Sequence, residues 1–123
     1  MAYGGQNIGF GDEIVFAGDP ARANVSITSG GDASDVIAAQ WGIFALSPNE
    51  TTSAQTALVL KTLGDGVSVA DGASAGIVIA SVVTDEGDTT GLAGDYYHEM
   101  TITTADGGYH SESGMIRLQK GAL

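Results

Sequence analysis

The sequence predicts an all-β fold, an antiparallel β-sandwich of about seven or eight strands. Short runs with apolar side chains at every second position recur along the chain, and turn residues separate them at intervals of about 8 to 12 residues. The 19 glycines and the many Val, Ile and Thr residues suit tight turns and pleated strands. No segment combines helical periodicity with helix caps, which also favours an all-β class.

The clearest local signal is a tyrosine corner at Leu92, Gly94 and Tyr96. In such a corner the hydroxyl of a tyrosine near the start of a strand bonds to the backbone a few residues upstream. We expect Gly94 to leave room for this close backbone approach. A strand follows the corner, and Asp106-Gly107 after it is a strong hairpin signal. Corner, strand and hairpin together favour an immunoglobulin-like sandwich.

Residues 1–11 are expected to form a flexible N-terminal arm, and residues 12–123 to form the sandwich domain. The arm is rich in glycine and carries three isolated apolar residues, Tyr3, Ile8 and Phe10, which are its candidate assembly contacts. Two alternatives remain open. Either the arm is an edge strand on its own domain, or it reaches a neighbouring subunit.

The first half of the domain contains three predicted strands, within residues 13–16, 23–28 and 36–46. The third strand carries the chain's one tryptophan and places four side chains on one face at a period of two residues: Ile37, Ala39, Trp41 and Ile43. Trp41 is therefore predicted to fill the core as a structural residue.

The second half contains five predicted strands, within residues 56–62, 67–69, 76–83, 96–103 and 115–119. The stretch 76–83 is apolar on both faces, which is typical of a central strand. Residues 85–91 form an acidic loop that leads into the corner.

The charge of the chain excludes several classes of partner. Fifteen acidic residues against four basic ones give a net charge of −11. Binding to nucleic acid requires clustered Lys and Arg, and anionic membranes also attract basic segments, so we expect neither partner. The chain has no Cys and therefore no disulfide or Cys-built zinc site.

Catalytic chemistry is not predicted. His98 is expected at the margin of the core and His110 in solvent beyond the hairpin, and no nucleophile motif accompanies them. Most Asp residues stand beside Gly, which is ordinary turn chemistry. An isopeptide bond from Lys61 or Lys120 would need a buried carboxyl, for which Glu99 is the strand candidate.

Metal binding has one weak candidate. Asp85, Glu86 and Asp88 place three carboxylates on one loop, and Ca²⁺ prefers six to eight oxygen ligands. The loop does not match the EF-hand spacing, so a solvated loop is the preferred interpretation and no cofactor is predicted.

A series of short motifs runs from residue 11 to residue 116: GDEIVF, AQWGIF, KT, GVSVADG, LAGDYYHEM, DG and SGMI. In this order the motifs resemble those of the small immunoglobulin-like domains of tailed-bacteriophage tail and baseplate proteins, over most of the chain. The resemblance implies a non-enzymatic virion structural protein, a tail, neck or head-decoration component without catalytic residues or cofactor. It implies other virion proteins and further copies of the chain as partners, synthesis in the bacterial host cytoplasm, and a final location in the virion.

The alternative function is a carbohydrate- or calcium-dependent surface binding module. It predicts a shallow aromatic platform formed by Tyr96 or Tyr97 with Tyr109. The first residues lack the basic and apolar segments of a signal peptide, and no apolar run is long enough to span a bilayer.

Overall fold

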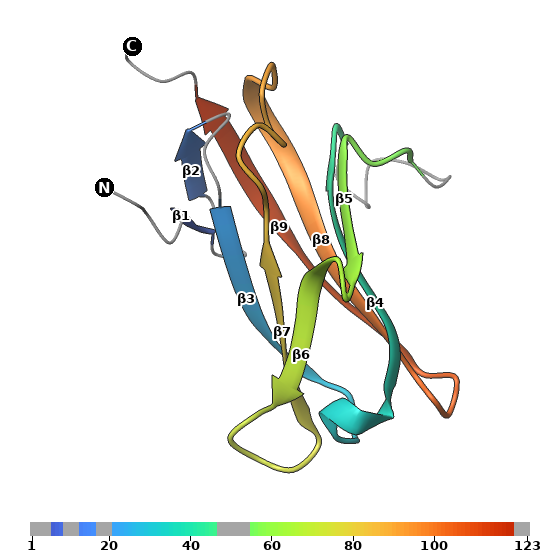
Figure 1. The fold of residues 1–123 in the computed structure, drawn as a ribbon. Helices are drawn as coiled ribbons and strands as arrows, with labels where there is room; N and C mark the ends of the chain where they lie inside the picture. Colours follow the sequence, from blue (N-terminus) through green and yellow to red (C-terminus); the bar gives the residue numbers. More distant parts are fainter. Residues whose placement is uncertain (1–5, 9–12, 17–20, 47–54, 120–123) are drawn as a thin grey trace.

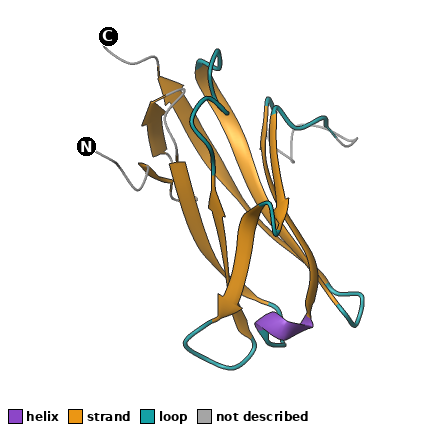
Figure 2. Cartoon of the chain, in the orientation of Figure 1, coloured by secondary structure: helices purple, strands orange, loops and turns teal. Residues whose placement is uncertain are grey.

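The computed structural model describes residues 6–8, 13–16, 21–46 and 55–119. These residues form nine strands and one short 3₁₀ helix (Figures 1 and 2). The elements are β1 (Gln6–Ile8), β2 (Glu13–Phe16), β3 (Ala21–Thr28), η1 (Ala33–Asp35), β4 (Val36–Phe44), β5 (Val59–Leu63), β6 (Gly66–Asp71), β7 (Ile77–Val83), β8 (Gly94–Thr104) and β9 (Tyr109–Gln119). All eight predicted strands are present as β2 to β9, so the all-β class is confirmed.

The strands form one continuous mixed sheet in the order β1-β3-β7-β6-β5-β4-β8-β9-β2. Most neighbours are antiparallel, but β1–β3, β2–β9 and β5–β6 pair in parallel. The sheet curls until β3, near one edge, contacts β9, near the other, and it is nearly closed into a barrel (Figure 1). The predicted immunoglobulin-like sandwich of separate antiparallel sheets is therefore not confirmed, because parallel pairing of β5 with β6 joins the two halves.

The core lies inside this curled sheet and follows the two-residue alternation of its strands. Trp41 and Ile43 of β4 are fully buried, as are Met100 and Ile102 of β8. The prediction for Ile37 is wrong, since its side chain is 63% exposed. The β4–β8 register shifts between Val36 and Ala38, and the resulting irregularity buries Val36 in place of Ile37.

The N-terminal arm is described in part. Residues 6–8 form β1, which pairs with residues 21–23 of β3, and this part of the arm takes the intramolecular alternative. Tyr3 and Phe10 lie outside the described residues, and Ile8 is described only as the last residue of β1.

Candidate functional site

The histidine expected at the core margin lies in the core itself. His98 is fully buried, and its Nδ1 accepts a hydrogen bond of 3.1 Å from the indole N–H of Trp41. The two rings meet edge to face with centroids 5.9 Å apart. Because Trp41 is on β4 and His98 on β8, this contact ties together two central strands and serves the fold.

The second histidine lies too far away to form a site with the first. His110 pairs with Ile102 on the β8–β9 ladder, whereas His98 pairs with Gly114. The four-residue offset corresponds to about 13 Å along the strands. The two imidazoles therefore do not share a catalytic centre.

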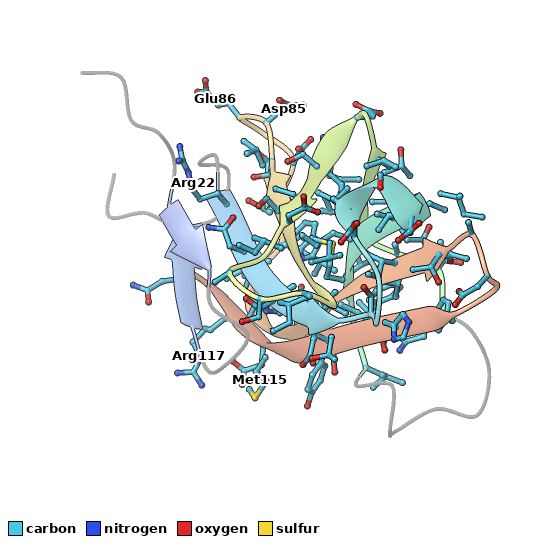
Figure 3. The ribbon with its side chains drawn as sticks, turned by 90° about the horizontal axis from the view of Figure 1, so that it is seen from below. Arg22, Asp85, Glu86, Met115 and Arg117 are labelled. Carbon is cyan, nitrogen blue, oxygen red and sulfur yellow. The ribbon has the colours of Figure 1, made fainter. Side chains whose placement is uncertain are left out.

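Lys61 binds two of the three carboxylates of the acidic loop between β7 and β8 and neutralises part of its charge. The Nζ of Lys61 lies 2.9 Å from Oδ2 of Asp88 and 3.2 Å from Oδ2 of Asp85. Asp88 also accepts the backbone N–H of Asp85 at 2.7 Å. Figure 3 shows Asp85 and Glu86 at the tip of this loop. Among the described residues, no group of three or more His, Cys, Asp or Glu side chains could hold a metal ion.

The Lys61 ion pair is shielded from solvent on one side. The Lys61 side chain is only 12% exposed, while that of Asp85 is 82% exposed. The hydrogen bond to Asp88 raises the pKa of Lys61 above its usual value, although burial opposes this shift and Asp85 adds to it. Burial alone would raise the pKa of Asp88, but the hydrogen bonds from Lys61 and the Asp85 backbone outweigh it, and the pKa is lowered. Both groups therefore stay charged near neutral pH.

An isopeptide bond from Lys61, assisted by Glu99, does not fit the register, and Lys120 lies outside the described residues. Lys61 pairs with Trp41, so its side chain leaves β5 on the core face of the sheet. Glu99 pairs with Gly42 and lies on the opposite, outer face. Glu99 therefore cannot assist a reaction at Lys61.

The residues of the predicted tyrosine corner lie together at the start of β8. The hydroxyl of Tyr96 donates to the carbonyl of Ala93 at 3.2 Å, and Leu92 packs against the core. Gly94 is required for a different reason than expected. A Cβ at Gly94 would meet nothing within 4 Å, but the residue has a φ of +111°, which favours glycine.

The aromatic platform of the alternative function does not form. Tyr96 lies against the core, on the face of β8 opposite to Tyr97. Tyr97 pairs with Met115, and Tyr109 is six residues away from Met115 on β9, which corresponds to about 20 Å. Tyr109 alone is exposed beside a shallow hollow of about 180 Å³, which Gln40, Thr101 and Thr103 help to line.

A second hollow lies at the end of the barrel near η1 and the β8–β9 turn. It measures about 390 Å³, and its polar lining includes Asp35 and Asp106. Both carboxylates accept hydrogen bonds from their own turns, Asp35 from the N–H of Asp32 and Asp106 from Thr104 and the N–H of Gly108. The hydrogen bond from Thr104 is the main cause that lowers the pKa of Asp106. These contacts explain the two carboxylates as parts of turns.

An apolar surface on the outer side of the sheet was not predicted from the sequence. Strands β5, β4, β8 and β9, with Leu58 directly before β5, turn a second set of alternating side chains away from the core. The N–H of Leu58 donates to the carbonyl of Ile43, which continues the β4–β5 pairing. The large apolar residues of this set are Phe44, Leu58, Leu60, Tyr97 and Met115. We call this set the Phe44 face. Figure 3 shows Met115 and Arg117 directed away from the barrel. The signal was present in the sequence, since these residues occupy the positions between the core residues.

Comparison with known families finds no family model that matches the sequence, and comparison with curated proteins finds no significant match. In the described part of the chain, no helix is long and apolar enough to cross a membrane.

Proposed function

We propose that this chain is a non-enzymatic structural protein of a bacteriophage virion, a tail, neck or head-decoration component. It acts through assembly contacts with other virion proteins and with further copies of itself. The proposal includes an immunoglobulin-like organisation of the barrel, no cofactor, synthesis in the bacterial host cytoplasm and a final location in the virion.

The strand order supports the immunoglobulin-like part of the proposal. The neighbours β3-β7-β6 and β5-β4-β8-β9 follow the orders B-E-D and C′-C-F-G of a variable-type immunoglobulin domain. Only two residue pairs join β5 to β6, so the connection between the two halves is narrow. Trp41 lies on the strand that corresponds to C, and Tyr96 lies near the start of the strand that corresponds to F, as in that fold.

The Phe44 face is the observation that carries the assembly role. Two side chains that could take part in chemistry stabilise the fold instead. His98 accepts a hydrogen bond from Trp41, and Lys61 forms ion pairs with Asp85 and Asp88. Among the described residues, the large apolar side chains of the Phe44 face are exposed or partly exposed and do not belong to the core. Contiguous exposed apolar side chains on a soluble protein are typical of an interaction surface.

Quantification of the chain in purified particles tests the proposed role. Antibodies raised against the chain would be used on density-gradient fractions of virions from infected cells. The proposal predicts a fixed copy number per particle that matches a ring or shell symmetry. A chain that stays entirely in the soluble fraction, apart from particles, would contradict the proposal.

One observation favours the alternative of a carbohydrate-binding surface module. Tyr109 is 64% exposed beside the hollow that contains Gln40 and Thr101, and an aromatic ring next to polar side chains can stack on a sugar. Titration with a panel of bacterial surface glycans, followed at Tyr109, tests this alternative. Binding that Tyr109→Ala removes would support it.

A further inference from the structure

We infer that the Phe44 face is a self-association surface that binds the same face of a second copy of this chain. This inference rests on the assembly role proposed above and names the surface that serves it.

The strand register brings the residues of the Phe44 face together. Phe44 of β4 pairs with Tyr97 of β8, and Tyr97 pairs with Met115 of β9. On the other side of β4, Gly42 pairs with Leu60 of β5. Side chains of paired residues on one face lie about 5 Å apart at Cβ, so the set forms one patch across four strands.

The composition of the Phe44 face is that of an interface core. Leu60 is 53% exposed, Leu58 is also exposed, and Phe44, Tyr97 and Met115 are partly exposed. Aromatic residues and Met are enriched in the cores of protein interfaces, while charged residues are depleted there. An exposed face with this composition is stabilised when a partner removes it from water.

Gly42 lets the Phe44 ring lie close to the sheet. A Cβ at Gly42 would lie 3.0 Å from two ring carbons of Phe44, so the ring lies over the backbone of its own strand at this glycine. The aromatic ring therefore covers the sheet instead of standing up from it. A ring that lies along its own strand leaves the neighbouring apolar side chains accessible to a second sheet, as in the face-to-face packing of a β-sandwich.

The distribution of charge favours a second copy over a basic partner. On the outer sides of β4, β5, β8 and β9, the described charged residues are Glu99 and the Asp95–Arg117 ion pair near one end. Most other described acidic residues lie at turns, such as Asp85, Glu86 and Asp88. A basic partner would be attracted to those turns. The Phe44 face carries little charge, so an equally apolar surface, such as the Phe44 face of a second copy, fits it better. Self-association here brings few like charges close together despite the net charge of −11.

The outer side of the four strands, with the Phe44 face as its apolar part, is large enough for a weak dimer. The 36 residues of β4, β5, β8 and β9, at a strand spacing of about 4.8 Å and a rise of about 3.3 Å per residue, give this whole side an area of roughly 600 Å² on each copy. Two copies would bury about 1,200 Å², the lower limit for specific protein interfaces. The dimer should therefore form in a concentration-dependent way.

A dilution series of the ¹⁵N-labelled full chain by NMR tests this inference. Between a low and a tenfold higher concentration, we expect amide shift changes concentrated at Gly42, Phe44, Leu60, Tyr97 and Glu99. Leu60→Ser should raise the dissociation constant of the dimer by at least about tenfold, which is a loss of about 1.4 kcal/mol in binding free energy. The matched control is Val83→Ser, because Val83 is 48% exposed but lies on β7, outside the Phe44 face. The dispersion of each spectrum shows that the variant is folded.

Three results would overturn the inference: no concentration dependence at all, shift changes centred on another surface, or association that Val83→Ser weakens as much as Leu60→Ser. None of these results contradicts the virion role, which the particle composition tests separately. Conversely, a dimer through the Phe44 face in a chain that is absent from particles would contradict the virion role alone.

Discussion

Trp41 donates its indole N–H to Nδ1 of His98, and both side chains are completely removed from solvent. Because the indole nitrogen can only donate, Nδ1 must act as an acceptor. The hydrogen-bond geometry thus assigns to His98 the neutral tautomer with its proton on Nε2. The most reactive side chain in the core is in this way fixed as a structural element between β4 and β8.

Replacement of the tryptophan tests the contribution of this contact. Trp41→Phe removes the donor to His98 and leaves a void in a fully buried site. We expect a loss of about 2–4 kcal/mol in the free energy of unfolding. Urea denaturation followed by far-UV circular dichroism measures this loss. A change below about 0.5 kcal/mol, the range of ordinary surface substitutions, would contradict the role given to Trp41.

The ion pair of Lys61 should stabilise the corner loop. Lys61→Met keeps much of the side-chain volume but leaves Asp85 and Asp88 without their cation. We expect a loss of about 1–3 kcal/mol in stability. The control is Arg117→Met, which removes the half-exposed ion pair with Asp95 and should cost clearly less than Lys61→Met, because solvent screens that pair. Equal losses for both variants would contradict the special role of Lys61.

The same pair predicts a pH dependence. The pKa of Asp88 is lowered from its ordinary 3.8, so its contribution is present above that value and is lost as the pH falls through the folded-state pKa. The pKa of Lys61 is raised from 10.5, so its contribution is present below that value and is lost as the pH rises through the folded-state pKa. The stability difference between wild type and Lys61→Met should therefore be constant near neutral pH and shrink below pH 3.8. A difference that persists unchanged in acid would contradict this account.

The tyrosine corner depends on one hydroxyl and one backbone conformation. Tyr96→Phe removes the hydrogen bond to Ala93 and should cost about 0.5–1.5 kcal/mol, whereas Tyr97→Phe on the outer face is its control. Gly94→Ala should cost about 1–2 kcal/mol through its positive φ, although there is space for the methyl group. Thermal unfolding of the three variants measures these effects. A neutral Gly94→Ala would show that the backbone at residue 94 is not constrained.

Glu99 should oppose folding slightly at neutral pH. Burial raises the pKa of Glu99 from its ordinary 4.5, so the penalty for its charge appears as the pH rises through the folded-state pKa and is absent below 4.5. Glu99→Gln removes this charge and should stabilise the chain at pH 7 by less than about 1 kcal/mol, since partial exposure screens the carboxylate. The gain should vanish at pH 4. Chemical denaturation at both pH values measures it, and destabilisation at pH 7 would instead reveal an attractive contact of Glu99.

The positions of the strands could be predicted because the alternation of apolar and polar residues within each strand reflects which of its side chains are buried. The two-residue alternation around Trp41 and the Asp106-Gly107 turn depend only on local sequence, and both predictions agree with the structure. The irregularity that exposes Ile37 could not be predicted, since an extra residue in a strand leaves no mark in an alternating run. The two halves are joined by β5–β6 pairing between residues only four apart, at a tight turn whose strand geometry the sequence does not specify. The near-closure depends on the contact of β3 with β9, which follows from tertiary packing and not from either strand alone.

The candidate site was harder to predict than the fold. The neutralisation of Asp88 by Lys61 joins residues from β5 and the β7–β8 loop, and no spacing in the sequence connects them. The depth of His98 follows from its contact with Trp41, whereas its own strand predicted only a place at the core margin. The Phe44 face could not be predicted, because a strand with an exposed apolar outer face has the same sequence pattern as a strand that is buried on both faces.

The molar mass of the chain in solution tests the central claim, that this protein works by assembling with itself and other proteins. Size-exclusion chromatography with light scattering at two concentrations a factor of ten apart is sufficient. We predict a mass above that of the 12.4 kDa monomer, increasing with concentration toward a closed oligomer. A mass of 12.4 kDa at both concentrations would contradict the claim of self-assembly.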